Sequence, residues 1–117
     1  MAATCSINND IYDQLGDRWY TAHDDPIALL RAESRLKTPW IRERLPLSAR
    51  VLDVGCGAGF LSNELAKSGF TVTGLDLSEE SLRVAAAHDE TQSVRYLTGD
   101  AYHLPFADGS FDAITAM

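Results

Sequence analysis

The stretch from Val51 to Phe60 constrains the fold of this chain more than any other. It begins with a short apolar run interrupted only by Asp53, a pattern typical of a buried strand in a parallel sheet. Three alternate glycines follow, and the apolar side chains after them recur at helical spacing, so the glycines should join a strand to a helix. Such a loop lets the backbone pass close to a ligand and directs the free N–H groups of the helix toward anionic or polar atoms. The stretch therefore predicts a nucleotide-type site centred on Gly55, Gly57 and Gly59.

The spacing of the glycines distinguishes between kinds of nucleotide. A dinucleotide fingerprint reads Gly-x-Gly-x-x-Gly, and here Phe60 occupies the place of the last glycine, with Gly59 one residue early. An NAD-dependent oxidoreductase is therefore a disfavoured alternative. Asp53 before the loop and Asp76 after a second predicted strand, residues 71–75, fit an Asp-x-Gly-x-Gly-x-Gly pattern with a later acidic residue. Without those two carboxylates, the glycines would fit a tight structural turn equally well.

This combination resembles the class I methyltransferases that use S-adenosylmethionine. The resemblance implies an α/β fold with a Rossmann-like, doubly wound and mostly parallel sheet, of which this chain would hold the first four strands. It also implies that the glycine loop passes under the methionine part of the cofactor, while Asp76 accepts hydrogen bonds from both ribose hydroxyls. Because the backbone must approach the ligand closely, Gly57 is expected to be the position that tolerates a side chain least.

A second stretch, residues 99–112, resembles the "type 11" methyltransferase group, in which Asp-Ala and then Leu-Pro-Phe precede Ser-Phe-Asp. The resemblance implies that Asp100 and the backbone of Ala101 bind adenine, with His103 at the border of that pocket. Alternatively, residues 104–106 form an apolar turn that fills the core. Together the two resemblances imply these cofactor-binding residues: Asp53, Gly55, Cys56, Gly57, Gly59, Asp76, Leu77, Asp100, Ala101 and Met117.

The N-terminal part, residues 1–46, is expected to form a helical cap on the cofactor-binding region, residues 47–117, which would be incomplete at its C-terminus. Apolar spacing predicts a helix over residues 9–20. A second helix is predicted over residues 25–36, and it should restart at residues 38–39, where a proline stands.

The cap carries a further resemblance, to the ubiquinone-biosynthesis O-methyltransferases. Residues 17–20 and the helix over residues 30–41 resemble the start of that family, which has an aromatic pair followed by Asn-Pro-x-Arg. This chain has Ser-Arg-Leu-Lys there, at residues 34–37. Lys37 would then replace the basic residue that reaches the cofactor's carboxylate. The alternative is a solvated lysine on a helix surface.

The rest of the chain continues the alternation of helices and strands. Gly69 is expected to end the helix after the glycine loop, and Ser78 to cap the next helix. Strands are predicted over residues 94–98 and 111–117, which implies right-handed parallel crossovers. The buried side of the helix after Ser78 should consist of Leu82, Ala85 and Ala86.

Composition excludes several classes of protein. The 117 residues carry a formal net charge of -7 without an evident basic stripe, so no nucleic-acid partner is expected. No apolar run reaches the length of a membrane span and no secretory signal is evident, which makes the cytoplasm the default location. Two cysteines and three histidines, without ligand spacing, predict neither a disulfide framework nor a metal site.

These observations predict a methyltransferase that uses S-adenosylmethionine on a small-molecule acceptor, and the resemblance of the cap suggests the hydroxyl of a phenolic or quinone precursor. No catalytic residue is identified. The alternative is a non-catalytic cofactor-binding fragment or interaction module. Because acceptor-selecting residues normally follow the fourth strand, the 117-residue chain alone is expected to transfer no methyl group. The unpaired edge of that strand is expected to favour self-association.

Overall fold

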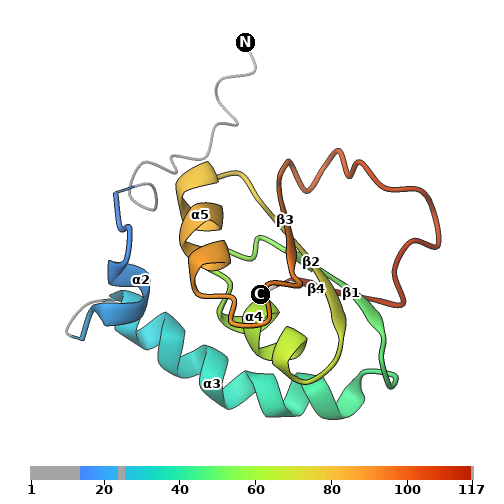
Figure 1. The fold of residues 1–117 in the computed structure, drawn as a ribbon, viewed down its shortest axis with the longest axis horizontal. Helices are drawn as coiled ribbons and strands as arrows, with labels where there is room; N and C mark the ends of the chain where they lie inside the picture. Colours follow the sequence, from blue (N-terminus) through green and yellow to red (C-terminus); the bar gives the residue numbers. More distant parts are fainter. Residues whose placement is uncertain (1–13, 24–25, 117) are drawn as a thin grey trace.

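The computed structural model describes residues 14–23 and 26–116 (Figure 1). In these ranges two N-terminal helices precede a regular alternation of strands and helices. The elements in chain order are α2 (Arg18–Thr21), α3 (Pro26–Arg44), β1 (Arg50–Val54), α4 (Phe60–Lys67), β2 (Thr71–Asp76), α5 (Glu79–Ala87), β3 (Arg95–Thr98) and β4 (Ala113–Ala116).

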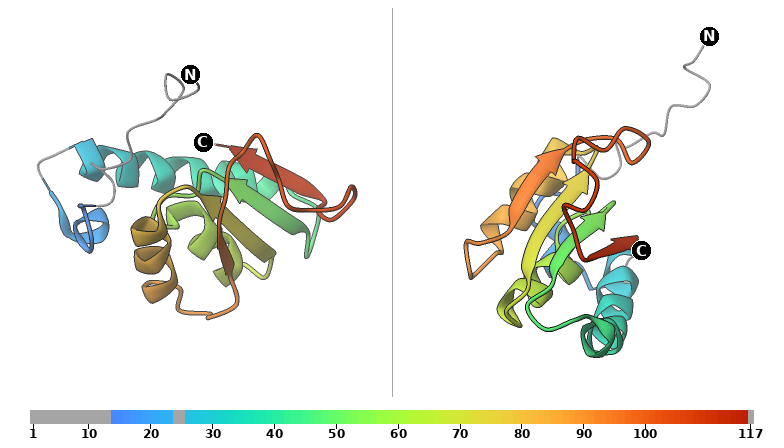
Figure 2. Two further views of the ribbon diagram at one scale, coloured as in Figure 1. Left: turned by 90° about the horizontal axis from the view of Figure 1, so that it is seen from above. Right: turned by 90° about the vertical axis from the view of Figure 1, so that its right-hand side faces the viewer.

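The strands form one parallel sheet in the order β3-β2-β1-β4 (Figure 2). β1 lies inside the sheet, where Val51 pairs with Val72 on one side and with Ala113 on the other. Because parallel neighbours end at the same edge, the loop that follows β1 begins beside Leu75 and Asp76. This topology confirms the predicted Rossmann-like α/β sheet. It also brings the glycine loop and Asp76 together at the same edge of the sheet.

The main core lies between the sheet and α4. Val51 and Leu65 are fully buried, and Val72 is 2% exposed. Burial of each such side chain contributes roughly 1.5–3 kcal/mol to stability. Ile41 of α3 and Leu45 after it pack on this cluster, which attaches α3 to the outside of α4. In the right-hand view of Figure 2, the strands lie in front and α4 and α5 lie behind them.

A second apolar cluster lies where the N-terminal helices meet the glycine loop. It joins Trp19 of α2, Ile27 of α3, Ala58 of the loop and Val84 of α5. The cap therefore shares a buried core with the loop, and it rests directly on the site that the sequence predicts.

Two predicted helix ends are confirmed. Gly69 has a φ of 95°, and the N–H groups of Gly69 and Phe70 donate to carbonyls in the last turn of α4, at 3.1 and 3.2 Å. Ser78 caps α5, because its hydroxyl accepts a hydrogen bond from the N–H of Ser81 at 3.1 Å.

The predicted restart at Thr38 and Pro39 is wrong, since α3 runs without a break from Pro26 to Arg44 with Pro39 inside it. Proline removes one N–H donor from a helix, but Pro39 lies on the exposed side of α3, where water can satisfy the freed carbonyl. The Thr38 hydroxyl donates to the carbonyl of Ser34 at 2.7 Å and supports the same turn. Before the proline, Ser34 and Thr38 are buried, and after it Ile41 is partly buried against the main core, so packing on both sides holds the helix in place.

The ends of other helices and strands differ from the predicted ones by a few residues. The predicted helix over residues 9–20 corresponds to a turn at residues 14–17 and to α2, while residues 9–13 lie outside the described ranges. The fourth strand begins at Ala113 rather than at residue 111. Ala86 was predicted to lie on the buried side of α5, but it is exposed. Val84 is buried there instead.

Candidate functional site

The loop between β1 and α4 has a backbone that glycine alone adopts without strain at three positions. Gly55, Gly57 and Gly59 have φ values of 69°, 55° and 81°. The N–H groups of Gly55 and Cys56 donate to the carbonyl of Leu75 at 2.7 and 3.1 Å, which fixes the loop to the end of β2. α4 has no side-chain cap, so its first N–H groups are available to a ligand.

Asp76 is the last residue of β2 and faces the loop. Its Oδ1 accepts a hydrogen bond from the N–H of Gly57 at 3.2 Å, and its Oδ2 accepts one from the N–H of Ser78 at 3.0 Å. An ionised carboxylate has about four lone-pair sites, so both oxygens can accept a further donor. Asp76 therefore supports the loop and still has capacity for a ligand.

Two cavities meet at Asp76. The first, of about 350 Å³, lies between the glycine loop and α3 and is lined by Trp19, Leu30, Glu33, Ser34, Lys37, Gly55, Cys56, Gly57, Phe60, Leu61, Asp76 and Ser81. The second, of about 240 Å³, is lined by Val54, Gly55, Leu75, Asp76, Leu77, Gly99, Asp100, Ala101 and Tyr102. Gly55 and Asp76 line both cavities, so an elongated ligand can extend from one to the other past them.

Most of the predicted cofactor-binding residues line these cavities, but Asp53 does not. It is 3% exposed, and its carboxylate accepts hydrogen bonds from the hydroxyls of Ser62 on α4, at 2.7 Å, and Thr115 on β4, at 2.9 Å. Burial raises the pKa of this carboxyl, and the two hydroxyls partly offset that effect. Asp53 thus lies beneath the loop and joins three elements. Gly59 also lines neither cavity, and Met117 lies outside the described residues.

Cys56 lines the first cavity as a protonated thiol. Burial, and then the negative charges of Asp53 and Asp76, raise its pKa well above the ordinary range. A thiol in such surroundings is a poor nucleophile, as the sequence predicts.

Trp19 is the principal residue that sequence analysis missed, since its spacing indicated only core packing. Its ring lies against the backbone of Gly57, where an added Cβ would lie 3.3 Å from the indole Cη2. The same ring meets Phe60 edge to face, with centroids 5.8 Å apart. A side chain at Gly57 would therefore displace Trp19, as well as straining a left-handed backbone.

Gly59 is packed more tightly than Gly57. A Cβ at this position would overlap the hydroxyl of Tyr96 and would approach the Cβ of Ala85 to 2.9 Å. The expectation that Gly57 tolerates a side chain least is therefore not supported by the packing, which is closest at Gly59.

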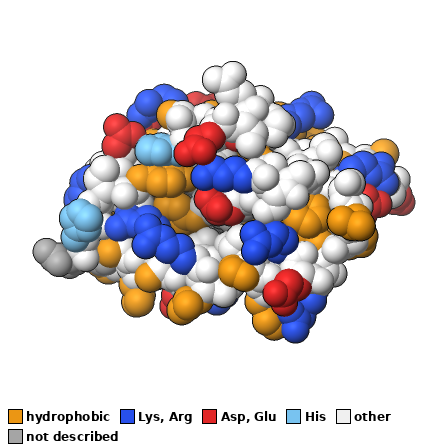
Figure 3. Space-filling model, turned by 60° about the horizontal axis from the view of Figure 1, so that its bottom comes forward, with side chains coloured by type: hydrophobic (Ala, Val, Ile, Leu, Met, Phe, Trp, Pro, Cys, Tyr) orange, Lys and Arg blue, Asp and Glu red, His pale blue; other side chains and the backbone are white. Residues whose placement is uncertain are grey.

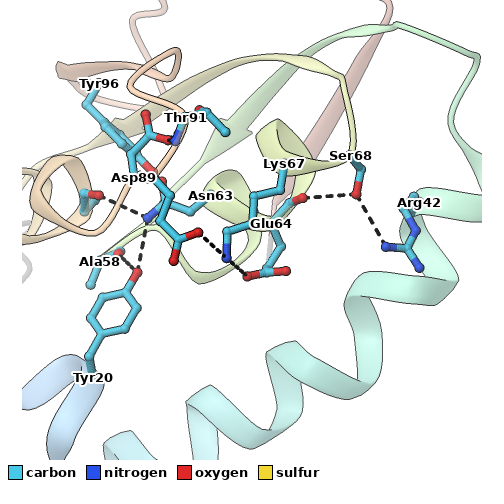
Figure 4. Close-up of polar contacts among 12 residues, drawn as sticks. Tyr20, Arg42, Ala58, Asn63, Glu64, Lys67, Ser68, Asp89, Thr91 and Tyr96 are labelled. Carbon is cyan, nitrogen blue, oxygen red and sulfur yellow. Dashed lines mark hydrogen bonds and ion pairs between the residues drawn. The ribbon is translucent and has the colours of Figure 1, made fainter.

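A buried polar network holds that packing in place (Figure 4). Asn63 of α4 donates from Nδ2 to the hydroxyl of Tyr20, at 3.3 Å, and to the carbonyl of Ala85, at 3.0 Å. Its Oδ1 accepts from the hydroxyl of Tyr96 at 2.6 Å, and Tyr20 donates to the carbonyl of Ala58 at 2.5 Å. The network connects α2, the glycine loop, α4, α5 and β3 around one amide side chain.

The histidines do not contribute to the two cavities. His88 is half-buried at the end of α5 and stacks on Tyr20, with ring centroids 3.7 Å apart. His103 is exposed beside Asp100, 3.5 Å away, rather than lining the second cavity as predicted. Across residues 14–23 and 26–116, no cluster of three or more His, Cys, Asp or Glu side chains is placed to hold a metal ion. None of the helices in these ranges has the length and apolarity needed to cross a membrane.

A parallel sheet with a glycine loop after β1 and a carboxylate at the end of β2 is typical of Rossmann-like nucleotide-binding folds, and Phe60 in place of the third glycine separates this loop from the dinucleotide type. The sequence profile of the methyltransferase domain family matches residues 51–117. The chain belongs to this family, whose cofactor is S-adenosylmethionine.

Individual relatives agree with this assignment. The ubiquinone biosynthesis O-methyltransferase of Xanthomonas oryzae pv. oryzae is 40% identical over 112 residues, which cover 92% of this chain and 46% of that protein. Among solved structures, the complex between the Haloferax volcanii Trm112 methyltransferase activator and the putative methyltransferase matches with a TM-score of 0.72 and 25% identity, over 90% of this chain and 46% of that one. Magnesium protoporphyrin IX methyltransferase from Synechocystis PCC 6803, with bound SAH, matches with a TM-score of 0.69 and 25% identity, over 92% and 55%. The chain thus spans about half the length of the curated relatives it matches.

Proposed function

We propose that the protein binds S-adenosylmethionine across the two cavities and takes part in methyl transfer to a small-molecule acceptor. The observation that carries this proposal is the position of Asp76, which lines both cavities and holds the glycine loop by a hydrogen bond to Gly57. A ligand with a ribose between two unlike ends fits such an arrangement.

The lining of each cavity suits one end of the cofactor. The first cavity holds the glycine loop and one ion pair, Lys37 with Glu33 at 3.8 Å, which complement the carboxylate and ammonium of the methionine part. The second cavity offers the exposed side chain of Leu77 for contact with the adenine ring. Asp100 and the backbone of Ala101 lie at the same cavity and would accept and donate hydrogen bonds to the edge of the base.

The bound cofactor supplies an electrophilic methyl group on a sulfonium. The residues of this chain would bind and orient it, so that catalysis rests mainly on proximity and alignment. Trp19, Leu30 and Phe60 give the first cavity apolar walls, which would exclude water from the methionine side. The acceptor we propose is the hydroxyl of a phenolic or quinone precursor, because the chain is similar to ubiquinone biosynthesis O-methyltransferases over nearly its whole length.

Isothermal titration calorimetry with S-adenosylhomocysteine, S-adenosylmethionine and NAD tests the binding part. Both adenosyl ligands should bind and NAD should give no heat, because Phe60 stands where a dinucleotide site needs glycine. Binding of NAD without binding of either adenosyl ligand would refute the proposal. Transfer of a labelled methyl group to a panel of catechols and phenols tests the acceptor. Because the 117 residues alone are expected to transfer no methyl group, this assay needs a protein that also spans the second half of the curated relatives, and binding without transfer by that protein would favour the non-catalytic alternative.

A further inference from the structure

The hydroxyl of Ser81 is buried and has no hydrogen-bond partner among the residues that the structure describes. Ser81 lies in the first turn of α5 and is 0% exposed. It also lines the first cavity, together with the glycine loop and Asp76. A buried hydroxyl without a partner has lost its hydrogen bonds to water and gained none in exchange, so it destabilises the folded protein. Native structures retain few such groups, and one that borders a cavity can find its partner in a ligand.

The remaining cavity of the described residues has no comparable group. It has a volume of about 380 Å³ and is lined mainly by α3 and α4. Two buried polar side chains in its lining, Thr38 and Asn63, are both hydrogen-bonded to the protein. Acidic and basic side chains are mixed on the face that carries α3 (Figure 3), and there Lys67 pairs with Glu64 and Glu90 at 3.3 Å. The unpartnered hydroxyl therefore belongs to the first cavity.

Two hydrogen bonds connect Ser81 to Asp76. The N–H of Ser78 donates to Oδ2 of Asp76 at 3.0 Å, and the N–H of Ser81 donates to Oγ of Ser78 at 3.1 Å. This turn fixes Ser81 relative to the carboxylate that is proposed to bind the ribose. The charged residues that suit the methionine end, Lys37 and Glu33, come instead from α3.

We propose that the Ser81 hydroxyl donates a hydrogen bond to a ribose hydroxyl of bound S-adenosylmethionine. An ionised carboxylate only accepts hydrogen bonds, so Asp76 binds the protons of the ribose hydroxyls and leaves their oxygen lone pairs without a donor. Ser81 supplies a donor, because a hydroxyl rotates to suit its partner. The two side chains then use one ribose hydroxyl both as a donor and as an acceptor. This inference rests on the proposed function and adds a cofactor-binding residue to it.

Two other roles for the hydroxyl are less consistent with the structure. A serine inside a helix can bond to the carbonyl four residues earlier, but Ser81 makes no such bond to Leu77. The methionine carboxylate is a second possible acceptor in the first cavity. Ligands with and without that carboxylate distinguish it from the ribose.

Replacing Ser81 with alanine should affect stability and binding in opposite directions. Without ligand, the melting temperature of Ser81→Ala should rise by about 2–6 °C, because alanine removes an unpaired hydroxyl and favours the helix. Ser62→Ala is the matched control, since Ser62 is also 0% exposed in a helix and lines neither cavity of the proposed site. Its hydroxyl donates to Asp53 at 2.7 Å, so the melting temperature of this control should fall by about 5 °C.

Calorimetry with two adenosyl ligands measures the binding part. S-adenosylhomocysteine and methylthioadenosine both contain the ribose, and only the first carries the amino-acid end. Ser81→Ala should bind both ligands about tenfold more weakly than the unchanged protein does. The 2′-deoxy and 3′-deoxy forms of methylthioadenosine then identify the hydroxyl. The form that lacks the contacted hydroxyl should bind equally well to the variant and to the unchanged protein.

Three results would overturn the inference. A lower melting temperature of ligand-free Ser81→Ala would mean that the hydroxyl has a partner within the protein. Unchanged affinity of Ser81→Ala for both ligands would mean that the hydroxyl does not reach the cofactor, while the unchanged protein's own binding would leave the proposed function standing. A loss with S-adenosylhomocysteine alone would assign the hydroxyl to the methionine end. If the unchanged protein bound neither ligand, the proposed function would fail together with this inference.

Discussion

Tyr20 and Ala58 are joined by a hydrogen bond in which the phenol of α2 donates to a backbone carbonyl of the glycine loop, 2.5 Å away. The two residues are 38 positions apart, so this bond fixes the N-terminal cap on the loop. Burial raises the pKa of Tyr20 to about 12, and the phenol therefore remains a protonated donor at neutral pH. The cap and the loop form one structural unit at the candidate site.

Replacing Tyr20 with phenylalanine should loosen this unit. The variant leaves the carbonyl of Ala58 without its donor and the amide of Asn63 without one of its acceptors, so the free energy of unfolding should fall by about 1–3 kcal/mol. Affinity for S-adenosylhomocysteine should fall with it, because the loop loses its anchor. Thr21→Val serves as the control, because it removes an exposed hydroxyl of the same helix that donates only to the carbonyl of Asp17, at 3.2 Å. Urea unfolding and calorimetry measure both effects, and equal values for the two variants would contradict this role of Tyr20.

Asp76→Ala should weaken both ligand binding and folding. Loss of charge-assisted hydrogen bonds to the ribose should cost about 1.5–3 kcal/mol of binding free energy, or roughly a 10- to 150-fold loss of affinity. Stability should fall as well, since the N–H groups of Gly57 and Ser78 lose their acceptor. Asp89→Ala is the matched control, because Asp89 accepts N–H groups of Thr91 and Val94 away from both cavities. Thermal melts with and without ligand separate the effects. If the two variants lose stability alike and both keep full affinity, Asp76 only supports the turn.

Gly55→Ala and Gly59→Ala should give opposite phenotypes although both residues have a left-handed backbone. A Cβ at Gly55 meets no atom within 4 Å, so this variant should fold with a penalty of about 1–2 kcal/mol for its φ. It should bind ligand less well, because Gly55 lines both cavities and an added methyl group would take up room beside the ligand. A Cβ at Gly59 overlaps Tyr96 and should add about 1–3 kcal/mol of overpacking to the same backbone cost. Circular dichroism and ligand titration check the pair. A stable Gly59→Ala protein would show that the network around Asn63 adapts.

The sequence allowed prediction of the features that depend on local pattern. Alternation of apolar strands and amphipathic helices predicted the parallel sheet, and the glycine spacing with Asp76 predicted where the sheet would carry a site. Gly69 and Ser78 end and begin helices through contacts within four residues, so their roles are visible in the sequence.

Features that depend on distant contacts could not be predicted. Trp19 reaches Gly57 and Tyr20 reaches Ala58 across 38 residues, and nothing near them in the chain specifies the partner. The continuity of α3 through Pro39 likewise depends on packing on both sides of that residue. The role of Asp53 is set by hydroxyls at residues 62 and 115.

The buried carboxyl of Asp53 should produce a distinctive pH dependence. Its pKa is raised in the folded protein, so the unfolded chain ionises first as pH increases. The contribution of Asp53 to stability should therefore decline from its ordinary pKa of 3.8 up to the raised value and then stay constant. Asp53→Asn lacks this decline, and its stability relative to the unchanged protein should improve as pH rises through that window.

Asp112 provides a control of opposite sign. Hydrogen bonds from Arg50 lower the pKa of Asp112, so its contribution to stability is present above its ordinary pKa and is lost as pH falls through the lowered value. Asp112→Asn should therefore be less stable than the unchanged protein at neutral pH, and this difference should begin to shrink as pH falls below the ordinary pKa of 3.8. Urea unfolding of the three proteins between pH 3 and pH 8, a range spanning roughly the ordinary carboxyl and histidine pKa values, measures both trends. Parallel curves for Asp53→Asn and the unchanged protein would mean that the Asp53 carboxyl is not desolvated, and that water reaches it beneath the glycine loop.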